Sequence, residues 1–151
     1  MLYQLNSVKF ATSAITEYYD TDFNLLRWLI GHNYNLDVIL PKLRNHLHFR
    51  QSRWNLDKIT EQPRNHPVHA FWKCGLTGPA LKTPNTIVNV EQTGSNDYWG
   101  MLSTFPINEL MKARIYDLEM MLKRVMELEN ETGIVLRSFT VTLYNIGYPD
   151  K

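Results

Sequence analysis

The sequence predicts an α/β protein with a small N-terminal helical lobe followed by an α/β lobe that has one long helix and few strands. Two adjacent apolar helical patterns between residues 22 and 50 predict the first lobe. A longer helical pattern that begins at residue 107, together with two short segments rich in β-branched and aromatic residues, predicts the second. With 151 residues, of which 44% are hydrophobic and 21% charged, the chain is long enough to bury a core.

The first helix is expected to follow Thr21, whose hydroxyl can cap a helix N-terminus. Gly31 can adopt the left-handed conformation that ends many helices, so the helix is expected to stop there. Between these two residues the apolar positions recur at helical spacing. They are Leu25, Leu26, Leu29 and Ile30.

A second helix is expected from Asn35 onward, with an apolar face whose members are three or four residues apart. Pro41 lies beyond the first turn and has no amide proton, so the helix should kink there or begin later than the pattern suggests. The predicted face consists of Leu36, Leu40, Leu43 and Leu47.

The boundary between the lobes is expected near residues 61–67, which contain two prolines and several polar residues. The helical lobe then covers residues 14–60 and the second lobe residues 66–151. Residues 75–84 are expected to form a loop, because glycine and proline recur there. Residues 86–92 are expected to form a strand.

The longest helix is expected to begin at Pro106 and to end at Gly133. Opposite charges four residues apart, Glu119 with Lys123 and Lys123 with Glu127, predict a solvated face. The predicted apolar stripe consists of Met111, Leu118, Leu122 and Val125, widened by Leu110, Ile115 and Met121.

Composition excludes several classes of function. A net charge of +1 gives no general attraction to nucleic acid. The single cysteine, Cys74, cannot form an internal disulfide, which suits a reducing compartment. No segment reads as a secretory signal or a membrane span, so the expected location is the cytoplasm.

Catalytic and metal sites find little support in the sequence, and we expect no enzyme activity and no cofactor. The residues Gly75, Gly78, Lys82 and Thr83 lack the glycine that a phosphate loop needs before its lysine, where Leu81 stands. His66, His69 and Cys74 are suitable zinc ligands without a fourth partner, and His46 and His48 do not share a helix face.

Hydrolytic sites are no better supported. Ser95 and Ser103 lack a nucleophile-elbow context, and Glu91 and Asp97 are more simply interpreted as solvated or capping residues. The four tryptophans, at positions 28, 54, 72 and 99, are not interleaved with basic residues, which favours burial in a core or interface over base stacking.

The segment Asp22–Arg50 resembles the N-terminal helical region of the CRAL-TRIO lipid-binding family, in which an acidic residue and an LLRxL motif precede a loop and another helix. The matching motif here is Leu25-Leu26-Arg27-Trp28-Leu29 after Asp22. The segments 66–78, 86–94 and 108–133 are similar to the start of that family's lipid-binding lobe.

The resemblance implies a non-catalytic protein, of the type that transfers phosphatidylinositol, tocopherol or retinal, with an apolar pocket for a hydrophobic small molecule or phospholipid. Such a protein exchanges its ligand through transient contact with a membrane surface. The expected pocket floor, for which plain core packing is an equally open reading, consists of Val88, Val90, Phe139, Val141 and Leu143.

The same resemblance implies an incomplete CRAL-TRIO-like lobe, truncated before the gate helix and the residues that contact lipid head groups. Asn145 stands where the family has an acidic residue before a glycine, here Gly147, and the first 19 residues lack the usual preceding helix. An alternative function follows, that of a non-transporting interaction or regulatory fragment. Its exposed sheet edge would then associate with another copy or a different partner.

Overall fold

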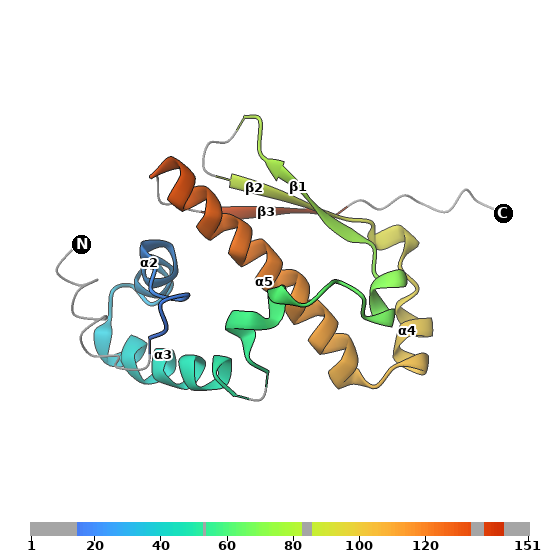
Figure 1. Ribbon diagram of the computed structural model, residues 1–151, viewed down its shortest axis with the longest axis horizontal. Coiled ribbons are helices and arrows are strands. Elements are labelled where there is room, and N and C mark those ends of the chain that lie inside the picture. Colours follow the sequence, from blue (N-terminus) through green and yellow to red (C-terminus); the bar gives the residue numbers. More distant parts are fainter. Residues whose placement is uncertain (1–14, 53, 83–85, 134–137, 144–151) are drawn as a thin grey trace. The chain divides into compact units, whose positions relative to one another are not determined.

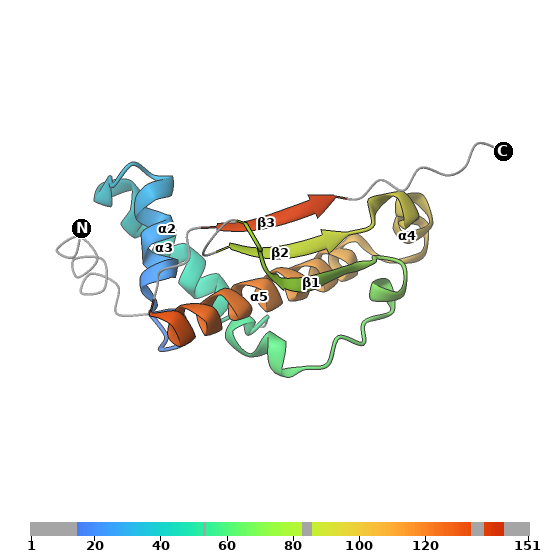
Figure 2. The same ribbon diagram turned by 90° about the horizontal axis from the view of Figure 1, so that it is seen from above.

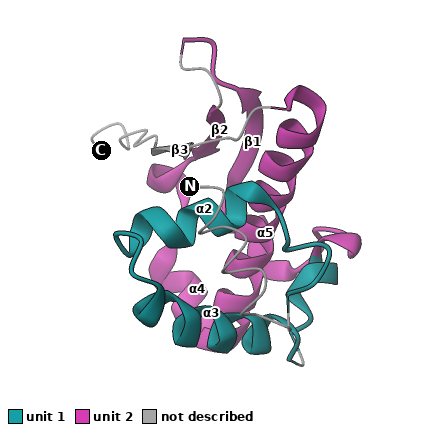
Figure 3. Ribbon diagram, turned by 90° about the vertical axis from the view of Figure 1, so that its left-hand side faces the viewer, with its two compact units in different colours: residues 1–59 teal, residues 60–151 magenta. Residues whose placement is uncertain are grey.

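The computed structural model describes residues 15–52, 54–82, 86–133 and 138–143. The chain divides into two compact units, Met1–Ile59 and Thr60–Lys151, which Figure 3 colours separately. Asn145 and Gly147, together with Thr83, lie outside the described residues. The described residues are mostly helical, with a small mixed sheet in the second unit, so the predicted α/β organisation is found in this coarser form.

The first unit begins with α2 (Asp22–Gly31), whose N-terminus is capped as predicted by the hydroxyl of Thr21. Leu25 and Leu29 are fully buried, whereas Ile30 is exposed. The predicted left-handed conformation at Gly31 is wrong. The positive φ angles occur at Asn33 and Tyr34 in the following turn, because the helix continues through the glycine before the chain reverses.

Helix α3 (Leu36–Arg50) begins after Asn35, whose side chain caps it, and it contains Pro41 rather than starting later. Its buried face is displaced from the predicted one, since Leu36 and Leu40 are only half-buried. Arg50 ends that face and pairs with Asp57 across 2.7 Å. A buried arginine is invisible to an apolar pattern, so the prediction missed it. The buried face consists of Ile39, Leu43, Leu47 and Arg50.

The second unit contains a sheet with the strand order β1-β2-β3, formed by Cys74–Pro79, Thr86–Glu91 and Ser138–Leu143. Strands β1 and β2 are antiparallel, and β2 and β3 are parallel. Strand β1 overturns the prediction of a loop over residues 75–84. Glycine and proline are tolerated there because β1 is an edge strand, which is interrupted between Leu76 and Gly78 by a bulge.

Between β2 and β3 the chain forms α4 (Tyr98–Thr104) and α5 (Ile107–Thr132). This connection supplies the long crossover that two parallel strands require. Figures 1 and 2 both show α5 running along one side of the sheet. As predicted, α5 begins directly after Pro106 and ends at Gly133, whose φ of 67° is left-handed.

The predicted apolar stripe of α5 is wrong in part, since Met111 and Leu118 are exposed. The buried face instead includes polar residues, among them Asp117 and Glu119. Burial of Glu119 also contradicts the solvated face predicted from its charge spacing. A small core joins α4 and α5 to the short 3-10 helix η2 (Pro67–Ala70), and it consists of Val68, Met101, Leu110 and Ala113.

Candidate functional site

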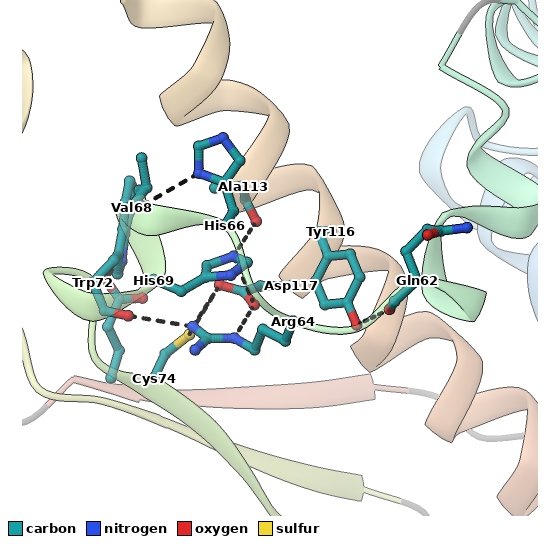
Figure 4. A network of polar contacts seen from close by, with 11 residues as sticks. Gln62, Arg64, His66, Val68, His69, Trp72, Cys74, Ala113, Tyr116 and Asp117 are labelled. Carbon is teal, nitrogen blue, oxygen red and sulfur yellow. Dashed lines mark hydrogen bonds and ion pairs between the residues drawn. The ribbon is translucent and has the colours of Figure 1, made fainter. Parts of the chain in front are cut away.

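A cluster of polar residues around Asp117 connects α5 to the sheet, as Figure 4 shows. The Asp117 carboxylate, which is 7% exposed, accepts hydrogen bonds from Arg64 Nε at 2.8 Å and Nη2 at 3.3 Å. The Cys74 thiol of β1 donates to the same carboxylate at 3.2 Å. Asp117 therefore fixes α5 against the first strand.

Two titratable side chains beside Asp117 are held in their neutral forms. Burial lowers the pKa of His69, whose Nε2 lies 3.2 Å from the carbonyl oxygen of Ala113. Burial, with the neighbouring Asp117 carboxylate, raises the pKa of Cys74 to about 11. A thiol with so high a pKa is a poor nucleophile at neutral pH, because the thiolate is the reactive form.

A second polar cluster surrounds Glu91 at the end of β2. Its carboxylate is buried and receives hydrogen bonds from the Trp72 indole at 2.8 Å and the Tyr98 hydroxyl at 3.4 Å. Arg114 of α5 pairs with the other oxygen at 3.0 Å, and its guanidinium stacks over the Trp72 ring. These contacts correct the expectation that Glu91 is a solvated or capping residue.

Val88 and Val90 occupy the alternate positions of β2 and are half-buried. Since successive side chains of a strand point to opposite faces, these valines face away from the side that contacts α5. In the parallel ladder their backbone partners are Thr140 and Thr142. Of the expected floor residues on β3, Phe139, Val141 and Leu143 pair with Ile87, Asn89 and Glu91, so they occupy different rungs from the valines.

An open hollow of about 520 Å³ lies beside β1 and β2. Its lining combines apolar residues such as Val90 and Leu76 with the basic residues Arg64 and Lys73. A hollow of this size is within the range that holds small ligands. Its mixed lining can accept both an apolar group and a polar one.

The residues weighed as zinc ligands have other partners. His66 contacts Glu109 at 2.7 Å, while His69 and Cys74 contact Ala113 and Asp117. Within the described part of the chain, no group of three histidine, cysteine or acidic residues is arranged to hold a metal. Asp97 caps α4 through the Gly100 amide, as one reading of the sequence expected.

Comparison with curated proteins finds a distant relative of this chain. Over 124 residues, 77% of this chain, the sequence is 26% identical to a CRAL-TRIO domain-containing protein of Caenorhabditis elegans. The chain is a distant homologue of a CRAL-TRIO domain-containing protein. The predicted resemblance is thus confirmed, although no protein-family profile matches the chain. The aligned region spans 29% of the relative's length.

None of the described helices is long and apolar enough to cross a membrane. Sequence reasoning missed Arg64, Arg114 and Asp117, which organise the buried polar clusters. The signal that could have found two of them is the presence of opposite charges, Arg114 and Asp117, three residues apart in the predicted helix beside the small residue Ala113.

Proposed function

We propose that this chain belongs to a lipid-binding protein that holds one hydrophobic small molecule or phospholipid and exchanges it at membranes. The observation that carries the proposal is the apolar face of β2, where Val88 and Val90 point away from α5. The homology to a CRAL-TRIO domain-containing protein supports the same function. The ligand would lie on this face.

Burial of an acyl chain supplies the affinity in this proposal. Each buried methylene contributes about 0.8 kcal/mol, so a chain of ten methylenes supplies several kcal/mol even after the cost of ordering it. The other expected floor residues, Phe139, Val141 and Leu143, pair with Ile87, Asn89 and Glu91, so the proposal rests on the valines and not on these three residues. The protein acts as a carrier in this proposal and catalyses no reaction.

A second candidate function rests on the edge position of β1. An edge strand can extend its ladder with another chain, so the fragment could associate through Cys74–Pro79 with a copy of itself or a partner. The bulge and Pro79 weaken that edge as a template, which favours the carrier function.

The test is binding of pyrene-labelled phosphatidylcholine and pyrenedecanoic acid to the purified chain, followed by fluorescence, with native mass spectrometry for stoichiometry. We expect a double Val88→Thr, Val90→Thr variant to bind about five-fold or more weakly, since two methyl groups are replaced by hydroxyls on the apolar face. Leu118→Thr, on the exposed surface of α5, is the matched control and should bind like the original chain.

Equal binding by the double variant and the original chain would show that Val88 and Val90 do not contact the ligand, which would overturn the proposal. If neither probe binds saturably and the measured mass of the protein doubles as its concentration rises, association through β1 is favoured instead. Melting temperatures of all variants are measured in parallel, so that loss of folding is separated from loss of binding.

A further inference from the structure

The open hollow of about 520 Å³ beside β1 and β2 has a positively charged lining. Arg64 and Lys73 border it, and none of the described residues that line it is acidic. Two further lining residues can titrate, but both are neutral at pH 7, because burial lowers the pKa of His69 and raises the pKa of Cys74 to about 11. We call this space the basic hollow, and its lining favours a negatively charged occupant.

The two cations of the basic hollow differ in how their charge is balanced. Arg64 pairs with the Asp117 carboxylate at 2.8 Å, and its side chain is 34% exposed. Lys73 is exposed, and within the described part of the chain its ammonium has no hydrogen-bond or ion-pair partner. The positive charge that remains unbalanced in the basic hollow is therefore that of Lys73, and a ligand can reach it from solvent.

Lys73 is held in place by its backbone. Its amide donates to the side-chain oxygen of Asn96 at 3.0 Å, and its carbonyl oxygen accepts from the Gln92 amide at 2.9 Å. These bonds fix Lys73 at the end of the sheet where β1 begins and β2 has just ended. Figure 4 shows Arg64 beside Cys74, the first residue of β1, so both cations of the basic hollow lie at this end of the sheet.

The basic hollow is continuous with the proposed ligand face of β2 through Val90. This valine lines the hollow and also lies on the face away from α5. Its direct partner in β1 is Gly75, and directly paired residues of antiparallel strands share a face. A Cβ at Gly75 would meet no atom within 4 Å, so the space beside Val90 is open. A ligand can therefore extend from the hollow over Val90 to Val88, about 7 Å further along the strand.

Charge at one end of the sheet and apolar surface along β2 together define the ligand. We propose that the basic hollow binds the anionic head group of a lipid, a carboxylate or a phosphate, while the apolar chain of the same lipid lies over Val90 and Val88. Lys73 pairs with the head group, and the absence of a side chain at Gly75 leaves room for the start of the apolar chain. This inference rests on the proposed function and narrows its ligand from hydrophobic molecules in general to anionic lipids.

The test is a fluorescence titration of the purified chain with pyrenedecanoic acid and with its methyl ester, both kept below the concentrations at which they aggregate. The two probes have the same ring and the same chain, and only the acid has a charged head group. At pH 8 we expect the acid to bind about ten-fold more tightly than the ester, because only the ionised carboxylate forms a charge-assisted bond with Lys73.

Three variants assign this preference to the basic hollow. Lys73→Gln removes the charge and should weaken the acid to the affinity of the ester, while the ester binds as before. Lys82→Gln removes the same charge from an exposed residue in the connection at the other end of β1 and β2, so this matched control should keep the ten-fold preference. Gly75→Val fills the open space beside Val90 and should weaken both probes to a similar degree. Melting temperatures show that each variant is folded.

Equal affinity of the original chain for the acid and the ester would overturn this inference and leave the carrier function standing, whereas failure of both probes to bind would overturn both. A preference for the acid that persists in Lys73→Gln would place the head group elsewhere. Displacement of the acid by an equal concentration of inorganic phosphate would also contradict the inference, because the hollow would then bind a free anion without an apolar chain.

Discussion

The two faces of the sheet are built from alternate residues of one strand, yet their chemistry is opposite. Toward α5, β2 presents Ile87, Asn89 and Glu91, all buried, and two of them polar. Away from α5 it presents Val88 and Val90, which are apolar and half-buried. Beyond Thr86, the buried polar residues of β2 therefore lie on the face toward α5, and the half-buried residues on the other face are both valines.

The face of β2 toward α5 positions that helix, whereas the opposite face is the one that the proposed function assigns to the ligand. Buried charged groups require particular partners, because an unpaired buried charge is costly, and they therefore favour one arrangement of the helix on the sheet. Asp117 and Arg114 of α5 contact Cys74 of β1 and Glu91 of β2, which defines the register of the helix on the sheet. Among the described residues, the opposite face makes no such contacts with α5, and it is the face on which the proposed function places the ligand.

The largest effect is expected from Glu91→Ala compared with Val90→Ala, its neighbour on the opposite face. Removal of Glu91 leaves Trp72, Tyr98 and Arg114 without their acceptor, which should lower the free energy of unfolding by about 3 kcal/mol. Val90→Ala should cost about 1 kcal/mol, since the side chain is half-buried. Urea unfolding followed by circular dichroism measures both. Equal costs would remove the distinction between the faces.

An intermediate effect is expected in thiol reactivity. With a pKa of about 11, Cys74 should react with iodoacetamide at pH 8 about 100-fold more slowly than an ordinary thiol. The control is Gly75→Cys in a Cys74→Ser background, because a Cβ at Gly75 meets open space and that position is exposed. Mass spectrometry follows alkylation of both proteins. Fast alkylation of Cys74 in the folded chain would show that the thiol is not held by Asp117.

The smallest effect is expected from His69, which lies on the α5 side. Because burial lowers its pKa below the unfolded value near 6.5, the unfolded state binds the proton more readily. The contribution of neutral His69 to the free energy of unfolding is complete above pH 6.5. It is lost as the pH falls below that value, by at most about 1.4 kcal/mol per pH unit.

Melting temperatures of the original chain and of His69→Gln between pH 7.5 and 5.5 measure this contribution. The pKa of His46 in the first unit is also lowered by burial, so only the difference between the two proteins reports on His69. The variant should lose less stability on acidification than the original chain. Parallel pH profiles would contradict the assignment.

Much of the local structure could be predicted because its signals lie within a few residues. Thr21 and Asn35 begin helices through side-chain caps, and Pro106 and Gly133 mark the two ends of α5. The strand at residues 86–91 follows from its β-branched composition. Strand β1 escaped prediction because its glycines and proline suit a loop, and only pairing with β2 makes them a strand.

By itself, then, the sequence determined the ends of the helices, one strand and the relationship to CRAL-TRIO domain-containing proteins, since caps, glycines and motifs act over short distances. The tertiary structure decided which faces are buried. The pairs Arg64 with Asp117 and Cys74 with Asp117 join residues 53 and 43 positions apart. Burial of a carboxylate on α5 becomes favourable only when such distant donors converge on it, and no local pattern encodes that convergence.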